Sequence, residues 1–287
     1  MTYKVVFYQN AVDFLGKALT DLSIDGTRNN LILGLALRLK DDIHAYTEND
    51  PMLAIVTDEQ GANAAMAIMT PPFPMILHSD PVNSEALETL ADALIKSDWQ
   101  ILGVNGEAQA SDVFALIWKQ KTGLETRINT NLRAYELKKI EDFGYPPGRM
   151  RVAKESDAQI VCDMLNAMRD ELVGLPGSPA TPEGALKSIR LSRTFFWVVD
   201  DQIVSITTAV RPQIKGICIS GVYTPPEFRR RGYARALVAE VTREMFARGY
   251  QLTNLFTDLA NPTSNKIYQE IGYKPVCDYH QYTFEAV

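Results

Sequence analysis

Cysteine and histidine, the residues that build disulfide frameworks and zinc sites, are scarce in this chain of 287 residues. The three cysteines form an odd, widely spaced set without a C-x-x-C pair, which predicts three reduced thiols. The three histidines cannot assemble an H-E-x-x-H helix or a histidine-rich cluster, so we expect no metal. These residues are Cys162, Cys218 and Cys277, and His44, His78 and His280.

Long apolar runs and excess positive charge are missing as well. No run approaches the ~20 residues that cross a bilayer, and the first residues lack a signal-peptide pattern, so we expect a cytoplasmic protein without a membrane partner. The net charge of −6 argues against nucleic acid as the main partner, because nonspecific binding draws on basic surface. An anionic ligand would therefore have to bind at a local cluster of basic side chains.

The apolar content of 46% supports full hydrophobic cores, and the length fits two domains of roughly 140 residues. Residues 144–149 contain two prolines between glycines and lie between two strand-like stretches. We therefore predict one domain over residues 1–143, a linker at 144–149 and a second domain over residues 150–287.

The most informative stretch is an apolar strand, 215–223, that runs into an arginine-glycine loop and a helix. Pro225 and Pro226 prevent the strand from continuing. Apolar residues recur at helical spacing from Ala234 onward, so the loop delivers the backbone to a helix N-terminus with free amides and a positive dipole end. Gly232 permits close approach to the main chain, and three arginines add charge, so we predict a phosphate site here.

The spacing Arg229-x-x-Gly232-x-Ala234 resembles the coenzyme A pyrophosphate loop of the GNAT superfamily of N-acyltransferases, Q/R-x-x-G-x-G/A. A second segment of that family also has a match after the next strand, with Asn261, Tyr268, Gly272 and Tyr273 in the order N…Y-x-x-x-G-[FY]. The resemblance implies acetyl-coenzyme A as cosubstrate. It implies coenzyme contacts at Val222, Tyr223, Thr224, Arg229, Arg230, Arg231, Gly232, Tyr233, Ala234, Asn261, Asn265 and Tyr268.

The resemblance also implies a fold. Across residues 150–285 the order is strand, helices, three strands, helix, strand, helix, strand, with Thr181 and Asn261 as helix caps and the last strand at 279–284. This order is similar to the GNAT architecture, an α/β (α+β) fold in which helices flank a mixed, mostly antiparallel sheet. We expect two such domains.

The first half shows a fainter version of that order. It includes a helix at 31–39, a hairpin of strands at 52–57 and 64–69, a strand at 73–78 and a helix capped by Ser84. Where the second half has arginines and glycine, the first has residues 78–83, without either and with Asp80 placed to repel phosphate. We therefore interpret the first half as a degenerate GNAT-like domain without a coenzyme site.

By resemblance, a primary amine attacks the acetyl thioester directly, and Tyr268 donates a proton to the leaving sulfur. Backbone amides near Val222 and Tyr223 bind the coenzyme. The strand at 215–223 lacks the glutamate that often acts as base in the family, so Glu171, Glu155 or a water relay remain as alternatives. Cys218 has no identifiable histidine partner and is expected to be a small buried residue.

The predicted function is N-acetylation of a primary amine on a small molecule or amino acid derivative. Two alternatives remain. One is a noncatalytic acyl-coenzyme A sensor, and the other is aminoacyl transfer from a charged tRNA, which would require a basic groove. The acceptor surface is expected in variable loops such as residues 174–182, and the sequence identifies neither the acceptor nor the oligomeric state.

Overall fold

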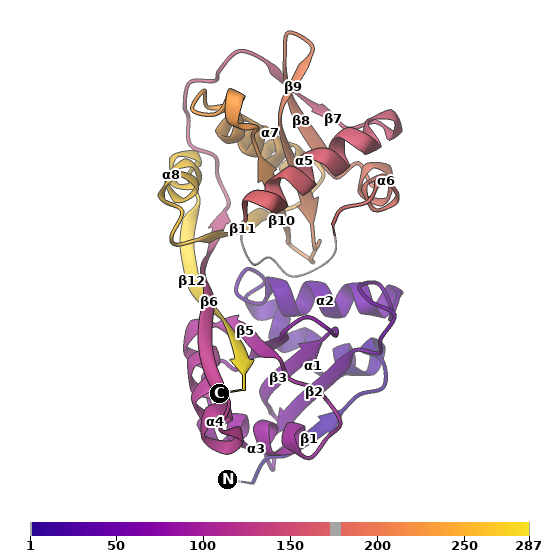
Figure 1. Cartoon of the computed structure of the whole chain (residues 1–287), viewed down its shortest axis with the longest axis vertical. Coiled ribbons are helices and arrows are strands. Elements are labelled where there is room, and N and C mark those ends of the chain that lie inside the picture. Colours follow the sequence, from indigo (N-terminus) through magenta and orange to yellow (C-terminus); the bar gives the residue numbers. More distant parts are fainter. Residues whose placement is uncertain (1, 173–178, 287) are drawn as a thin grey trace. The chain divides into compact units, whose positions relative to one another are not determined.

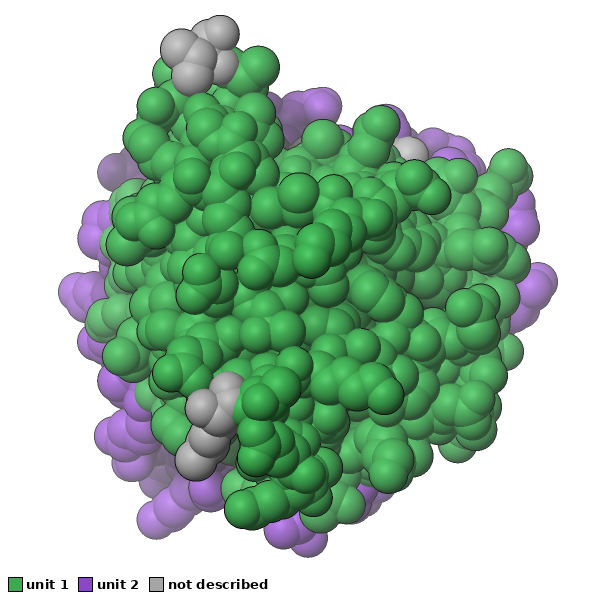
Figure 2. Space-filling view, turned by 90° about the horizontal axis from the view of Figure 1, so that it is seen from below, with its two compact units in different colours: residues 1–134, 258–260, 276–287 green, residues 135–257, 261–275 purple. Residues whose placement is uncertain are grey.

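The computed structural model of the chain describes residues 2–172 and 179–286. The chain folds into two compact units, and each unit gathers segments that are distant in the sequence (Figure 1, Figure 2). Unit 1 contains residues 1–134, 258–260 and 276–287, and unit 2 contains residues 135–257 and 261–275. The units divide the chain at residue 134, whereas the predicted linker at 144–149 lies inside unit 2.

Unit 1 is built on a sheet with the strand order β1-β2-β3-β4-β5-β12-β6. β4 and β5 pair in parallel, while β1 with β2, β2 with β3, β3 with β4, and β5 with β12 pair antiparallel. Its elements are β1 (Lys4–Phe7), α1 (Ala11–Ile24), α2 (Asn30–Asp41), β2 (Met52–Thr57), β3 (Asn63–Met69), β4 (Met75–His78), α3 (Ser84–Ile95), β5 (Gly103–Glu107), α4 (Ala108–Thr122), most of β6 (Glu125–Leu137) and most of β12 (Lys274–Glu285).

Two hydrophobic clusters cover the two faces of this sheet. On one face, α1 and α2 bury Phe14, Leu22 and Leu33 against Leu53 and other strand residues whose side chains point to this face. On the other face, α3 and α4 bury residues such as Leu87, Leu90 and Phe114. The sheet is therefore the middle layer of three, as the alternating burial of β2 and β3 residues between the two clusters requires.

Unit 2 has the strand order β6-β11-β10-β9-β8-β7, starting from the end of β6. α7 and α8 pack on one face of this sheet, and α5 and α6 pack on the other (Figure 1). Its elements are β7 (Arg149–Val152), η1 (Glu155–Asp157), α5 (Ala158–Glu171), α6 (Pro182–Arg190), β8 (Thr194–Val199), β9 (Gln202–Val210), β10 (Gly216–Tyr223), η2 (Pro226–Phe228), α7 (Tyr233–Ala247), β11 (Leu252–Asp258) and α8 (Pro262–Ile271).

The mixed α/β fold, with helices flanking the mostly antiparallel strands of each unit, confirms the predicted fold class. The order of elements in the second half is as predicted, and Thr181 and Asn261 cap α6 and α8 through their side chains. Two elements, β1 and α1, were not predicted. The cap of α3 was predicted wrongly: Asn83 accepts the hydrogen bond from the amide of Ala86, and Ser84 is the first helical residue.

The last strand lies mostly in a different unit from the predicted one. β12 was expected to close the second half, but from residue 276 it belongs to unit 1, where Tyr279 lies opposite Glu107 of β5. The pattern of side chains along a strand shows which face is buried, but it does not show which strand lies next to it in the sheet.

The proline-rich stretch at 144–149 is held on unit 2 by aromatic contacts. Tyr145 stacks on Phe143 with ring centroids 4.7 Å apart, and the indole N–H of Trp197 donates to the carbonyl of Pro147 at 3.0 Å. Composition suggested a linker because prolines and glycines break regular structure. It could not show that the neighbouring rings pack against unit 2. Within the described residues, no helix is long and apolar enough to cross a bilayer.

Candidate functional site

The strands β10 and β11 separate partway along their length. They pair in parallel only from Gly216 to Cys218, which lies opposite Asn254 of β11. On the other side of β10, the register with β9 shifts between Ser220 and Tyr223, where Gly221 has a φ of +62°. This bulge bends the end of β10 toward the loop that follows.

The loop after β10 presents unpaired amides at the start of α7. Arg230 and Gly232 both have positive φ, at +62° and +81°, and α7 begins at Tyr233 with Gly232 as its cap. Among the described residues, no carbonyl accepts a hydrogen bond from the amides of residues 230–234. Successive free amides at a helix N-terminus form a concave anion site, so the backbone fits the pyrophosphate expected there.

Gly232 is required by conformation rather than by space. A Cβ built on it would meet nothing closer than Pro146, at 3.9 Å. Its positive φ is nevertheless costly for most residues with a side chain. Glycine therefore sets the path of the loop, and Ala234 occupies the first turn of α7 as predicted.

The three arginines of the loop have different surroundings. Arg229 donates to both carboxylate oxygens of Glu171, at 2.6 and 2.7 Å, and to the carbonyl of Thr224 at 2.8 Å. Arg231 donates to the carbonyl of Glu227 at 3.1 Å. Arg230 is exposed and makes no polar contact with any described residue. Arg230 is thus the cation most available to a bound phosphate.

Glu171 is committed to structure, which weakens it as a candidate base. Besides Arg229, it accepts a hydrogen bond from the hydroxyl of Tyr223 at 3.0 Å. The guanidinium of Arg229 lowers the pKa of Glu171 below its usual range, and burial opposes that shift less strongly. Glu155 is similarly paired, with Arg190 at 3.1 Å, and its pKa is also lowered. A carboxylate with a lowered pKa is a weaker proton acceptor at neutral pH.

The second predicted segment, residues 261–273, forms α8, which packs against residues of β10 and β11. Asn261 caps the helix by accepting from the amide of Ser264 at 3.0 Å. Asn265 donates to the carbonyl of Asn261 at 2.7 Å and accepts from the hydroxyl of Tyr135 at 3.0 Å. Both asparagines therefore already have structural roles, and contact between Asn265 and a coenzyme remains a prediction.

Tyr268 lies on the inner side of α8, 7% exposed, with its ring edge against Tyr273 at 6.0 Å between centroids. Within the described part of the chain, its hydroxyl has no hydrogen-bond partner. Burial raises the pKa of Tyr268, and the nearby Tyr273 and Cys218 add to the effect. The phenol therefore stays protonated at neutral pH, and its role as proton donor to sulfur remains a prediction.

Cys218 is buried, as expected, and Asn254 was missed. Cys218 is 1% exposed, accepts a hydrogen bond from Arg211 at 3.0 Å, and has its pKa raised by burial. Asn254 is 0% exposed, and neither polar atom of its side chain finds a partner in the described residues. The sequence signal was a single carboxamide inside the otherwise strand-like LTNLFTD, which has the composition of an ordinary strand.

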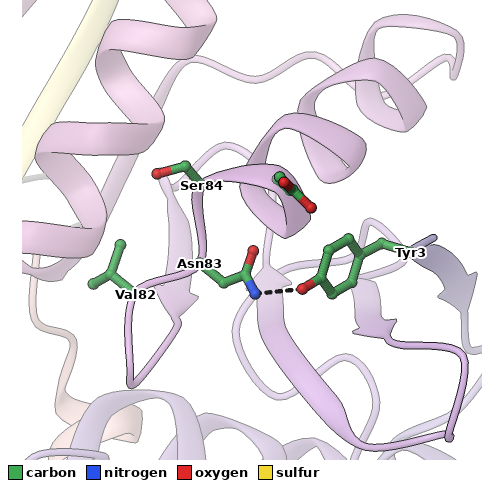
Figure 3. Close-up of a pocket in the computed structure, with 5 residues that line it drawn as sticks. Tyr3, Val82, Asn83 and Ser84 are labelled. Atoms are coloured by element: carbon green, nitrogen blue, oxygen red, sulfur yellow. Dashed lines mark hydrogen bonds between the residues drawn. The ribbon is translucent and has the colours of Figure 1, made fainter. Parts of the chain in front are cut away.

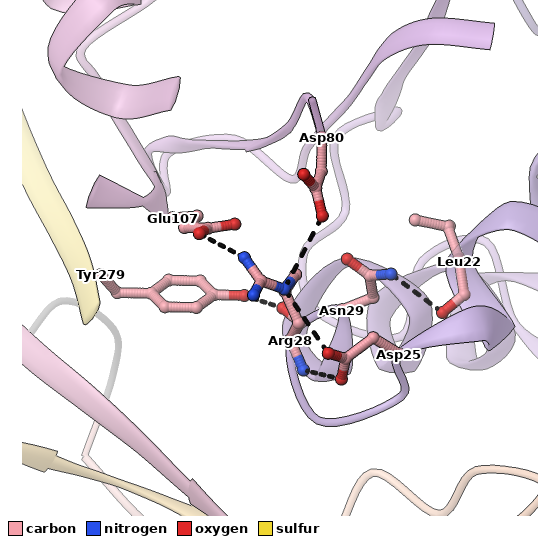
Figure 4. Close-up of polar contacts among 7 residues, drawn as sticks. All are labelled: Leu22, Asp25, Arg28, Asn29, Asp80, Glu107 and Tyr279. Carbon is pink, nitrogen blue, oxygen red and sulfur yellow. Dashed lines mark hydrogen bonds and ion pairs between the residues drawn. The ribbon is translucent and has the colours of Figure 1, made fainter. Parts of the chain in front are cut away.

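The corresponding region of unit 1 is filled by an ion-pair cluster. Arg28, in the turn between α1 and α2, contacts Glu107 at the end of β5 and lies 3.5 Å from Asp25 and 3.7 Å from Asp80 (Figure 4). The hydroxyl of Tyr279 donates to the carbonyl of Arg28. The guanidinium is already surrounded by carboxylates. The loop after β4 therefore offers a phosphate an acidic side chain, Asp80, in place of a free cation.

A shallow pocket of about 480 Å³ lies at the N-terminus of α3 in unit 1 (Figure 3). Tyr3, Val82, Asn83, Ser84 and Glu85 line it, and the side-chain amide of Asn83 donates to the hydroxyl of Tyr3 at 2.6 Å. Asn83 also caps the helix, and Glu85 adds negative charge in its first turn. This helix start thus differs chemically from that of α7, which has free amides beside an unpaired arginine.

Similarity to solved structures identifies the fold. A GCN5-related N-acetyltransferase from Sphaerobacter thermophilus aligns over 99% of this chain and 97% of its own, with a TM-score of 0.62 and 17% identity. A GNAT-family acetyltransferase from Colwellia psychrerythraea aligns over the whole of both chains, with a TM-score of 0.62 and 12% identity. The chain has the GNAT fold.

Two further comparisons refine this result. A tandem GNAT protein from the clavulanic acid biosynthesis pathway aligns over 98% of this chain and 97% of its own, with a TM-score of 0.58 and 12% identity. The family model described as FR47-like protein matches residues 200–282, which include the arginine-glycine loop and α8. A search of curated protein sequences finds no match.

Proposed function

We propose that this GNAT-fold protein transfers an acetyl group from acetyl-coenzyme A to the primary amine of a small molecule or amino acid derivative. The observation that carries the proposal is the loop at 230–234, where free amides, a glycine with positive φ and the unpaired Arg230 coincide at the start of α7. Amides and a cation together suit a pyrophosphate. We place the arm that carries the thioester between β10 and β11, beyond the point where their pairing ends.

The reaction is an aminolysis of the thioester. The amine nitrogen attacks the carbonyl carbon, a C–N bond forms, the C–S bond breaks, and the amine gives up one proton while the thiolate gains one. The protonated hydroxyl of Tyr268 supplies the proton to sulfur, and the resulting phenolate takes a proton back from water before the next turnover. Because Glu171 and Glu155 are paired with arginines, we assign the amine proton to water rather than to either carboxylate.

The proposal includes no nucleic acid or membrane partner and no metal, and it places the reaction in unit 2 alone. A net charge of −6 supports the exclusion of nucleic acid, since transfer from a charged tRNA requires a basic groove. A noncatalytic sensor of acyl-coenzyme A would keep the same loop, so turnover decides between sensor and enzyme. Of the loop expected to carry the acceptor surface, residues 174–178 lie outside the described residues.

The test combines binding with turnover. Calorimetry with acetyl-coenzyme A is compared between wild type, Gly232→Asn and Gly232→Asp, since Asn and Asp tolerate positive φ to a similar degree and differ in charge. We expect measurable binding in wild type and Gly232→Asn and its loss in Gly232→Asp. Equal affinity in the two folded variants contradicts the loop assignment. Thiol release with a panel of primary amines then separates the enzyme from the sensor.

A further inference from the structure

The strongest unexplained feature of unit 2 is the side chain of Asn254. It is the third residue of β11, it is 0% exposed, and within the described residues both Oδ1 and Nδ2 lack a hydrogen-bond partner. An unpaired buried polar group costs about 1–3 kcal/mol, and such groups are few in native proteins. Leucine has nearly the same shape without that cost. The unpaired carboxamide therefore indicates a partner that the chain does not itself supply.

The neighbours of Asn254 fix the side of the sheet on which it lies. Thr253 bonds to Tyr273, and Leu255 packs in the cluster beneath α7 and α8. Because side chains alternate along a strand, Asn254 points to the opposite face, together with Cys218, its partner on β10. This pair is the last before the two strands separate. The carboxamide thus lies at the inner end of the opening between β10 and β11.

The same place is close to the proposed proton donor. Tyr268 packs in one cluster with Ile217, Ile219 and Leu255, which flank Cys218 and Asn254 along their strands, and Cys218 and Asn254 are adjacent across the strand pair. A thioester inserted between the strands, with its sulfur at Tyr268, brings its carbonyl toward the level of Asn254. We assign the attacking amine to the face of the sheet that carries Asn254, opposite α7 and α8.

A carboxamide offers one acceptor and one donor group side by side. The intermediate of aminolysis presents the complementary pair, an N–H from the amine and a negatively charged oxygen, both attached to the same carbon. We propose that Asn254 is a catalytic residue that accepts a hydrogen bond from the attacking amine through Oδ1 and donates one to the acyl oxygen through Nδ2. This inference rests on the proposed acetyl transfer. Asn254 keeps all of its own protons throughout the step.

Unit 1 supplies a matched control. Asn105 is also the third residue of its strand, β5, and lies opposite Ile76 of β4 in a parallel pair, as Asn254 lies opposite Cys218. Its Oδ1 is buried without a partner in the described residues too. Unit 1 lacks the arginine-glycine loop, so Asn105→Leu removes the same kind of group from the unit without the proposed site.

The experiment measures Asn254→Leu, Asn254→Ala and Asn105→Leu against wild type. The readouts are Tm, calorimetric affinity for acetyl-coenzyme A and for coenzyme A, and thiol release with a panel of primary amines. We expect Asn254→Leu to keep or raise Tm, because it removes an unpaired polar group, and to leave the affinity for coenzyme A unchanged. Its kcat should fall about 10²–10³-fold, the usual loss of an oxyanion donor, and its affinity for acetyl-coenzyme A about tenfold, the value of one hydrogen bond.

The outcomes separate this inference from the proposed function. If wild type acetylates no amine, the proposed function fails. The contact between Asn254 and the acyl group is then still supported if Asn254→Leu loses affinity for acetyl-coenzyme A but not for coenzyme A. If Asn254→Leu and Asn254→Ala match Asn105→Leu in turnover and in both affinities, Asn254 only holds a buried water and the inference is overturned. Equal losses of acetyl-coenzyme A and coenzyme A affinity overturn it as well, because they indicate a general disturbance of the opening.

Discussion

Arg229 and Glu171 form an ion pair through both carboxylate oxygens, and this pair ties the loop between β10 and α7 to the end of α5. One guanidinium nitrogen of Arg229 lies 2.6 and 2.7 Å from the two carboxylate oxygens of Glu171. The Nε–H of Arg229 donates a hydrogen bond to the carbonyl of Thr224 in the same loop. The guanidinium also lies over the ring of Tyr223, 5.7 Å from its centroid. Arg229 is thus occupied in holding the loop, which separates its role from that of Arg230.

This ion pair predicts an acid-dependent stability difference. Arg229 lowers the pKa of Glu171 in the folded chain, so the pair stabilises the fold above the unfolded pKa of the carboxyl and is lost as the pH falls through the folded value. Tm of wild type should exceed that of Glu171→Gln near pH 7, by a small margin because both side chains are about 40% exposed. The margin should vanish under acid. A margin that is constant with pH would show that charge pairing is not its cause.

The two arginines should differ in coenzyme binding. Arg230→Ala removes an unpaired cation, so the affinity for acetyl-coenzyme A should fall about 10-fold, and the salt dependence of binding should weaken. Arg229→Ala removes a cation already neutralised by Glu171, and its effect on affinity should be smaller. Calorimetry at two salt concentrations measures both. The reverse order of effects would mean that the phosphate displaces Glu171 from Arg229.

Two tyrosines of the same cluster offer a matched test of proton transfer. The hydroxyl of Tyr268 is unpaired among the described residues, so Tyr268→Phe should leave Tm unchanged, while kcat falls about 10²–10⁴-fold from loss of a positioned acid. The hydroxyl of Tyr273 bonds to Thr253 at 2.8 Å and Thr242 at 3.2 Å. Tyr273→Phe should therefore lower stability by about 1 kcal/mol without a comparable loss of turnover. Full activity in Tyr268→Phe reassigns that residue to packing.

The elements of unit 2 and the loop that joins β10 to α7 could be predicted because their signals are local. Prolines end β10, Gly232 and Thr181 mark helix starts, and apolar spacing marks α7. What could not be predicted depends on contacts between distant segments. The pairing of β12 with β5 and the ion pair of Arg229 with Glu171 join residues at least 58 positions apart, and the isolation of Asn254 involves a missing partner. No spacing rule expresses such contacts.

The contrast between the two units predicts one coenzyme site per chain. In unit 1, Arg28 is held by Glu107, Asp25 and Asp80, and Asp80 repels phosphate. Titration of the full chain should therefore reach one acetyl-coenzyme A per chain. Arg28→Met should keep that stoichiometry and affinity but lower stability by about 2 kcal/mol, because it leaves partly buried carboxylates unpaired. Two equivalent sites in wild type, or loss of binding in a folded Arg28→Met variant, would place part of the coenzyme site in unit 1.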